Sequence, residues 1–191
     1  YDVLDDDGIW VFEQSYMPTM LEKNSYDTIC HEHLEFYALH QIKWMADRVG
    51  FKIIDVELNN INGGSFSVVV SKVLGNTKVS PVVQIILDNE MDLALNTLKP
   101  YEEFKKRVVS SRDELLKFIE NVQADGKTIA ALGASTKGNV LLQYCGLTDE
   151  KITCVGEVNS EKYGYGVEYH LKRKGLFIEI YADMSLNLYD S

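Results

Sequence analysis

The stretch "KTIAALGASTKGNVLLQYCG", residues 127–146, decides the fold class of this chain. It starts with a short apolar run typical of a strand, continues through a glycine-bounded loop, and ends with the apolar spacing of an amphipathic helix. A second strand-like run, "KITCVGE", follows at residues 151–157. Strand, helix and strand in this order predict a β-α-β unit, and hence a small α/β domain over residues 127–191.

Upstream of this unit the composition is mostly helical. Residues 80–122 carry a broad apolar stripe at helical spacing, with a break predicted at Pro100. Gly126 follows the last apolar position, where a helix is expected to have ended. We therefore expect residues 73–126 to form a helical connection.

The first 72 residues predict a second α/β region. "GIWVFEQSY", residues 8–16, is an apolar run typical of a buried strand that ends in a loop, and a short helix is expected at residues 17–23. A helix is predicted over residues 38–49, with Gly50 as its left-handed C-cap. "FKIIDVEL" and "SFSVVVSK" then predict an antiparallel pair of strands. This order is typical of the end of a class I methyltransferase sheet, although many α/β folds share it.

Composition restricts the function classes. The chain has 191 residues and 46% hydrophobic content, enough to fill a core, and its formal charge of −10 disfavours nucleic acid or an anionic membrane as a partner. Neither a membrane-spanning apolar run nor the charge order of a signal peptide is visible, so we expect a soluble, cytoplasmic protein. The three cysteines are widely spaced, which predicts reduced, buried thiols rather than disulfides or a zinc site.

"GASTKGN", residues 133–139, is a candidate phosphate-binding loop. Backbone N–H groups at the start of a helix, the hydroxyls of Ser135 and Thr136, and the Lys137 ammonium are suited to an anion, and glycines such as Gly138 permit close approach. The spacing matches neither GxxxxGK[ST] nor GxGxxG, which disfavours an ATPase or a standard dinucleotide site. Glu157 lies roughly where a Rossmann unit has its ribose-binding acid. A plain tight turn between strand and helix is the alternative.

The glycine pair in "INGGSFS", residues 61–67, has two interpretations. It allows a ligand to approach the backbone near Gly64 and Ser65, but a simple β-turn requires the same residue types. The residues alone favour the turn.

"YDTICHEHLEFYAL", residues 26–39, concentrates ionisable groups. If extended, it places His31 and His33 on one face, whereas a loop would let Glu32 orient His33. A histidine beside a carboxylate is suited to general-base catalysis. Metal binding by His31 and His33 is a weaker hypothesis because zinc sites need three or four ligands, and we predict no metal. Polar residues bonding to backbone at a strand end are the remaining alternative.

Five segments taken together resemble the sugar C-methyltransferase family. They are "FEQSY", "YDTICHEHLEFYAL", "VGFKIIDVE", "NGGSF" and "GASTKGNVLLQYCGL", in this order over roughly residues 8–163. The resemblance implies transfer of a methyl group from S-adenosylmethionine to a carbon of a nucleotide-linked keto-deoxysugar. It also implies a zinc-binding amino-terminal domain, a methyltransferase domain and a carboxyl-terminal α/β domain. This chain would hold the tail of a class I, Rossmann-like methyltransferase domain (residues 1–72), followed by the smaller Rossmann-like domain (residues 127–191).

The family's catalytic histidine and its neighbouring glutamate fall on His33 and Glu32. The resemblance implies that His33 removes a proton beside the ketone, after which the enolate carbon attacks the sulfonium methyl. The resemblance also implies that the carboxyl-terminal domain helps to hold the sugar nucleotide. The candidate substrate-binding residues are Tyr37, Gly64, Ser65, Ser135, Thr136, Lys137 and Gly138.

The sequence departs from the family pattern at several points. Cys30 stands where many relatives have a tyrosine that positions the keto group, so Tyr26, Tyr37 or His31 would have to replace it. Ser67 stands where relatives often have an arginine, and the tail lacks the family's Thr-Pro-Gly-Thr stretch. The S-adenosylmethionine loop and the zinc cysteines are expected upstream of this chain. We therefore expect the carboxyl-terminal portion of a longer enzyme or a truncated relative, with a noncatalytic nucleotide-binding or interaction module as the alternative.

Overall fold

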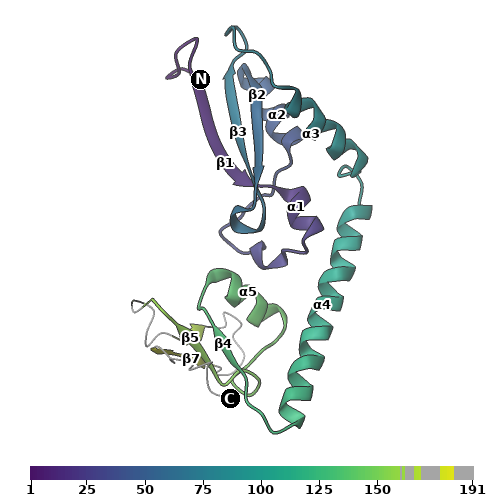
Figure 1. Ribbon diagram of the computed structural model, residues 1–191, viewed down its shortest axis with the longest axis vertical. Coiled ribbons are helices and arrows are strands. Elements are labelled where there is room, and N and C mark those ends of the chain that lie inside the picture. The colour runs from purple at the N-terminus through teal and green to yellow at the C-terminus, as the bar shows by residue number, and fades with distance from the viewer. Residues whose placement is uncertain (160, 162–165, 169–176, 183–191) are drawn as a thin grey trace, which may run out of the picture. The chain divides into compact units, whose positions relative to one another are not determined.

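The computed structural model describes residues 1–159, 161, 166–168 and 177–182, so most of the divergent tail lies outside the described residues. The chain divides into two compact units (Figure 1). Unit 1 comprises Tyr1–Tyr26 and His33–Val108, and unit 2 comprises Asp27–Glu32 and Val109–Ser191. The predicted mixed α/β class is confirmed. The division at residues 72 and 126 stays a prediction.

Unit 1 contains a three-stranded antiparallel sheet in the order β1-β3-β2 (Figure 1). Its strands are β1 (Ile9–Ser15), β2 (Phe51–Asn59) and β3 (Ser65–Lys72). The central strand β3 is the most buried, with Phe66, Val68 and Val70 almost fully covered. The predicted antiparallel pair is confirmed.

Strand β1 corrects one expectation, because its apolar residues are not buried. Ile9, Trp10 and Val11 are each about half exposed, at 54%, 50% and 54%. Within the described residues β1 pairs only with β3, so one edge of the strand lacks a neighbour. An apolar run such as this one suits a strand with neighbours on both sides, and in this chain it forms an edge instead.

Helices cover the sheet of unit 1. α1 (Met17–Glu22) follows β1, and α2 (Leu39–Val49) and α3 (Pro81–Asp92) pack against β2. Gly50 ends α2 in the left-handed conformation at φ 87°, as predicted. Short 3₁₀ turns lie at Tyr26–Thr28 and Ile61–Gly63.

Unit 2 contains the predicted β-α-β unit. β4 (Ala130–Leu132) and β5 (Cys154–Glu157) are parallel neighbours, joined through α5 (Thr136–Tyr144). β7 (Phe177–Ala182) extends the sheet in parallel, and β6 (Gly166–Glu168) pairs with β7 in antiparallel fashion. α4 (Lys99–Ala124) contains the unit boundary, and its carboxyl-terminal part adds Ile119 to a core with Leu142, Cys145, Leu147, Ile152 and Val155.

Two further expectations concern membranes and cysteines. None of the helices in the described part of the chain is long and apolar enough to cross a bilayer.

All three cysteines are free thiols, but only Cys145 and Cys154 are buried, whereas Cys30 is half-buried. The predicted burial is therefore confirmed for two of the three.

Candidate functional site

The HEH segment, defined here as His31, Glu32 and His33, is a turn rather than a strand. All three side chains are exposed, and no regular element covers residues 29–36. The extended arrangement is therefore wrong for this segment, and the loop alternative describes it. A turn separates neighbouring side chains less strictly than a strand does, so the strict split between His33 and Glu32 no longer applies.

His33 and Glu32 fall on opposite sides of the unit boundary. In unit 1, the His33 ring lies beside Phe36, with ring centroids 5.8 Å apart. In unit 2, the Thr136 hydroxyl lies 3.5 Å from Glu32 Oε1, a long hydrogen bond in an exposed position. The roles of His33 as base and of Glu32 in orienting it stay predictions.

Tyr37 fixes the carboxyl-terminal end of the same segment within unit 1. Its carbonyl accepts a 2.9 Å hydrogen bond from the Met17 N–H, and it forms an isolated parallel bridge with Tyr16 at the end of β1. The Tyr37 hydroxyl donates to Glu35 Oε2 over 2.5 Å. This hydrogen bond is the main cause that raises the pKa of Tyr37, because the phenolate form would lose the donated proton.

Gly64 and Ser65 both have internal partners in unit 1. Gly64 is buried at φ 137°, and a Cβ there would lie only 2.2 Å from Thr19 Cγ2 of α1. Its carbonyl accepts the Tyr16 N–H at 3.0 Å. Ser65 is 3% exposed and its hydroxyl donates to the Ile61 carbonyl. Burial of both residues favours the turn interpretation, and their contact with substrate stays a prediction.

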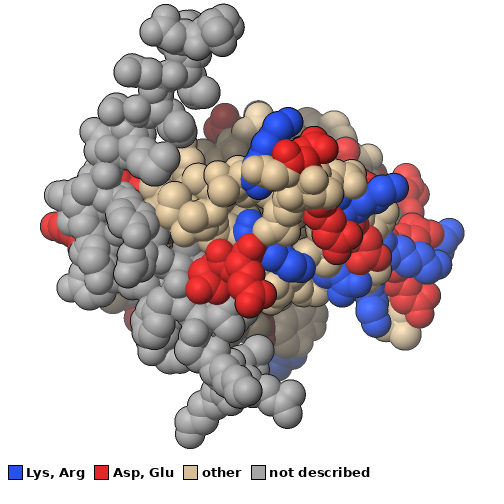
Figure 2. Space-filling view, turned by 90° about the horizontal axis from the view of Figure 1, so that it is seen from below, with Lys and Arg blue, Asp and Glu red and all other residues tan. Residues whose placement is uncertain are grey.

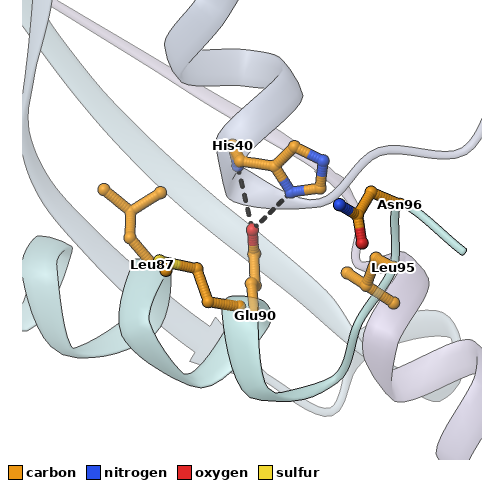
Figure 3. Close-up of a pocket in the computed structure, with 6 residues that line it drawn as sticks. His40, Leu87, Glu90, Leu95 and Asn96 are labelled. Atoms are coloured by element: carbon orange, nitrogen blue, oxygen red, sulfur yellow. Dashed lines mark hydrogen bonds and ion pairs between the residues drawn. The ribbon is translucent and has the colours of Figure 1, made fainter.

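Tyr16, Leu39, His40 and Glu90, termed the Glu90 cluster, form a hydrogen-bonded group around a buried carboxylate that the sequence analysis missed. Figure 3 shows two of its members, His40 and Glu90. Glu90 lies on α3 with its side chain only 2% exposed. Glu90 Oε1 accepts the Tyr16 hydroxyl at 2.8 Å and the Leu39 N–H at 2.6 Å. Glu90 Oε2 accepts the His40 N–H and faces His40 Nδ1, both at 2.9 Å.

A signal for Glu90 was present in the sequence. It continues the spacing of Val83 and Ile86, the other two buried residues of α3, so the charge stands on the apolar face of the helix. A carboxylate there must have donors around it. Burial and the nearby Glu90 carboxylate raise the pKa of Tyr16, so the hydroxyl keeps its proton and donates it to Glu90.

A cavity of about 300 Å³ opens beside this cluster. His40, Glu90 and Asn96 are its polar lining residues, and Figure 3 shows His40 facing Glu90. Leu87, Met91 and Leu95 supply its apolar wall. Because a carboxylate accepts hydrogen bonds, the contact to Glu90 favours the proton on His40 Nδ1.

The GASTKGN loop lies in unit 2 at the carboxyl end of β4. Ser135 is the N-cap of α5, and its Oγ accepts the Gly138 N–H at 3.0 Å. Glu157, at the end of β5, accepts the N–H of Ala134 through Oε2 and those of Val158 and Asn159 through Oε1. The acid that resembled a ribose ligand therefore ties the loop to the neighbouring strand.

The distribution of charged side chains shows no basic binding patch on the face viewed in Figure 2. Figure 2 shows Lys and Arg interspersed with Asp and Glu on the face that it views, not gathered into one basic area. No group of three His, Cys, Asp or Glu suited to a metal ion occurs among the described residues.

Comparison with known proteins gives two findings. Residues 60–169, more than half of the chain, match the family described as the C-methyltransferase C-terminal domain. The chain is also 32% identical over 162 residues to the C-methyltransferase NovU of Streptomyces niveus. That alignment covers 85% of this chain but 39% of the relative, so the chain spans about two-fifths of the length of the relative that it matches.

Proposed function

The chain belongs to the C-methyltransferase C-terminal domain family, and from this premise we propose that it is the substrate-side portion of an S-adenosylmethionine-dependent C-methyltransferase. Its substrate is a keto-deoxysugar linked to a nucleotide. The observation that carries the proposal is the family match over residues 60–169, because it includes the complete GASTKGN loop. The similarity to a C-methyltransferase reaches 85% of the chain and supports the same class.

His33 is the proposed base. Its imidazole is exposed in a turn, where a substrate can reach it, and imidazole has the basicity needed near pH 7. A proton on the carbon beside a ketone is acidic enough to be removed by a histidine, provided that the developing enolate oxygen is stabilised. Glu32, next in the chain, is proposed to orient His33 once substrate is bound.

The proposed nucleotide contacts come from unit 2. Ser135 caps the first turn of α5, and the side chains of the next two residues, Thr136 and Lys137, are proposed for the diphosphate. The start of a helix favours an anion through its N–H groups and its dipole. Glu157 supports the loop from β5 and is not proposed as a substrate contact.

The cofactor is proposed to lie on a part of the enzyme outside this chain. S-adenosylmethionine supplies an electrophilic methyl group when bound. We do not assign its site to the β1–α1 turn, because β1 leads through Tyr16 directly into α1, with no glycine-rich turn between them. Within the described residues β1 pairs only with β3, so its other edge suits pairing with a further strand of a Rossmann-like sheet.

The test is solvent exchange at the substrate carbon. A thymidine-diphosphate-linked keto-deoxysugar is incubated with the chain in D₂O, and deuterium incorporation beside the ketone is followed by NMR. We expect exchange with the wild type, loss of exchange by about a hundredfold in His33→Ala, and no loss in the surface control Lys43→Ala, whose side chain binds Asp47 at an exposed position of α2. Exchange by His33→Ala at the wild-type rate would exclude His33 as the base. Nucleotide binding with no exchange by the wild type would favour the noncatalytic module.

A further inference from the structure

The Glu90 cluster joins three segments that are far apart in the sequence. Tyr16 lies between β1 and α1, Leu39 and His40 begin α2, and Glu90 comes from α3. Figure 3 shows His40 and Glu90 facing each other across the two helices. Glu90 accepts hydrogen bonds from the Tyr16 hydroxyl and from the N–H groups of Leu39 and His40, and His40 Nδ1 lies 2.9 Å from Glu90 Oε2.

The main chain at Tyr16 and Met17 connects the Glu90 cluster to two further segments of unit 1. The Tyr16 N–H binds the Gly64 carbonyl, and the following N–H, of Met17, binds the Tyr37 carbonyl. The side chain of Tyr16 is held by Glu90 and by packing on Phe66, with ring centroids 5.0 Å apart. The buried Glu90 carboxylate therefore helps to fix Tyr16, and through Tyr16 and Met17 the backbone at Gly64 and at Tyr37.

We propose that Glu90 is a positioning residue for His33. It fixes the Tyr37–His40 end of the segment that carries His33, and so limits the positions that the imidazole can take. This role rests on the proposed function of His33 as the base. Glu90 touches neither substrate nor reacting atoms in this account, and it acts through the start of α2 and through Tyr16.

Glu90 can position the start of α2 because several hydrogen-bond donors depend on its one carboxylate. The N–H groups of Leu39 and His40 belong to the first turn of α2 and have no partners within that helix. Substituting glutamine replaces one accepting oxygen by an NH₂ group, which faces donors and leaves at least one of them unsatisfied. The start of α2 should then open locally while the sheet stays formed.

The experiment is amide hydrogen exchange by NMR on the complete 191-residue chain. In Glu90→Gln we expect exchange at Leu39 and His40 to rise about tenfold more than exchange at Val68 in the buried strand β3. The matched control is Asp88→Asn on the same helix, an exposed side chain bonded to Gln84, for which no difference is expected. An equal rise at all three amides, or no rise at any, would overturn the proposal.

A second variant and a second readout separate positioning from general stability. Tyr16→Phe keeps the ring against Phe66 and removes only the hydroxyl that donates to Glu90. If Glu90→Gln does not fold, this variant tests whether the Glu90 cluster positions His33. In both variants the deuterium exchange of the sugar nucleotide at saturation should fall about tenfold, with half-saturation changed less than twofold. An unchanged exchange rate would overturn the proposal. If the wild type exchanges no deuterium, the proposed function fails, and amide exchange still decides whether Glu90 fixes α2.

Discussion

At the scale of single residues, Gly64 is required by its neighbour as well as by its backbone conformation. Its φ of 137° lies where side chains are rarely found, and Thr19 of α1 occupies the space that a Cβ would enter. Gly63, directly before it, has φ 92° but only an ordinary contact, with Ser25 Oγ at 3.4 Å from the Cβ position. A side chain at Gly63 would therefore cause backbone strain alone, whereas one at Gly64 would cause backbone strain and steric overlap.

We predict that Gly64→Ala lowers the free energy of unfolding of unit 1 by about 3 kcal/mol, because strain and overpacking add. Gly63→Ala should lower it by about 1 kcal/mol, through strain alone. Urea unfolding followed by tryptophan fluorescence measures both, since Trp10 and Trp44 both lie in unit 1. Equal effects of the two substitutions would show that contact with Thr19 is unimportant.

Tyr16 predicts a dependence of stability on alkaline pH. Its pKa is raised in the folded state by burial and by Glu90, above the ordinary value of 10.0. Above about pH 10 the unfolded chain loses this proton while the folded chain keeps it, so stability falls as pH rises. We expect Tyr16→Phe to reduce this fall between pH 9 and pH 11, as measured by urea midpoints. An identical pH slope in both proteins would contradict the raised pKa.

The residue scale also shows what the sequence could not predict. The antiparallel strands, the Gly50 cap and the glycine turn follow from local patterns and were predicted. Glu90 was missed because its partners, Tyr16 and Leu39, are 74 and 51 residues away. A charge on the apolar face of a helix indicates that donors are needed but does not say which ones. Such long-range polar pairing appears only when the tertiary structure is known.

At the scale of elements, α5 depends on its cap. Ser135 Oγ accepts the Gly138 N–H and has non-helical backbone angles, as an N-cap residue should. We predict that Ser135→Ala lowers the stability of α5 by about 1 kcal/mol, whereas Ser135→Asp retains it because aspartate also caps helices. Amide exchange along residues 138–144 measures this. If the alanine and aspartate variants exchange alike, the cap does not stabilise the helix.

The elements themselves were largely predictable, except at two places. The β-α-β unit, the helix ending at Gly50 and the strand pair have strong periodic patterns. The HEH segment was ambiguous because three polar residues fit a strand end or a loop equally well, and the loop formed. β1 was expected to be buried because its sequence is apolar, but burial depends on neighbours that the pattern does not contain.

At the scale of the whole molecule, the family match and the sheet arrangement support the same account. Unit 1 has the order β1-β3-β2, in which an antiparallel pair lies at one side of an apolar edge strand. Unit 2 presents the loop between β4 and α5 at the carboxyl end of parallel strands, where α/β proteins commonly bind ligands. Unit 1 carries the proposed base, His33, and unit 2 carries the loop proposed to bind the nucleotide.

The most direct test of the central claim is methyl transfer by a fusion of this chain with the part of the Streptomyces niveus relative that the chain does not cover. S-adenosylmethionine with a ¹³C-labelled methyl group and a thymidine-diphosphate-linked keto-deoxysugar are supplied, and NMR follows the label. The account predicts the label on a sugar carbon, a loss of about a hundredfold in His33→Ala, and no loss in the surface control Lys43→Ala. Transfer by His33→Ala at the wild-type rate, or label on a sugar oxygen, would contradict it.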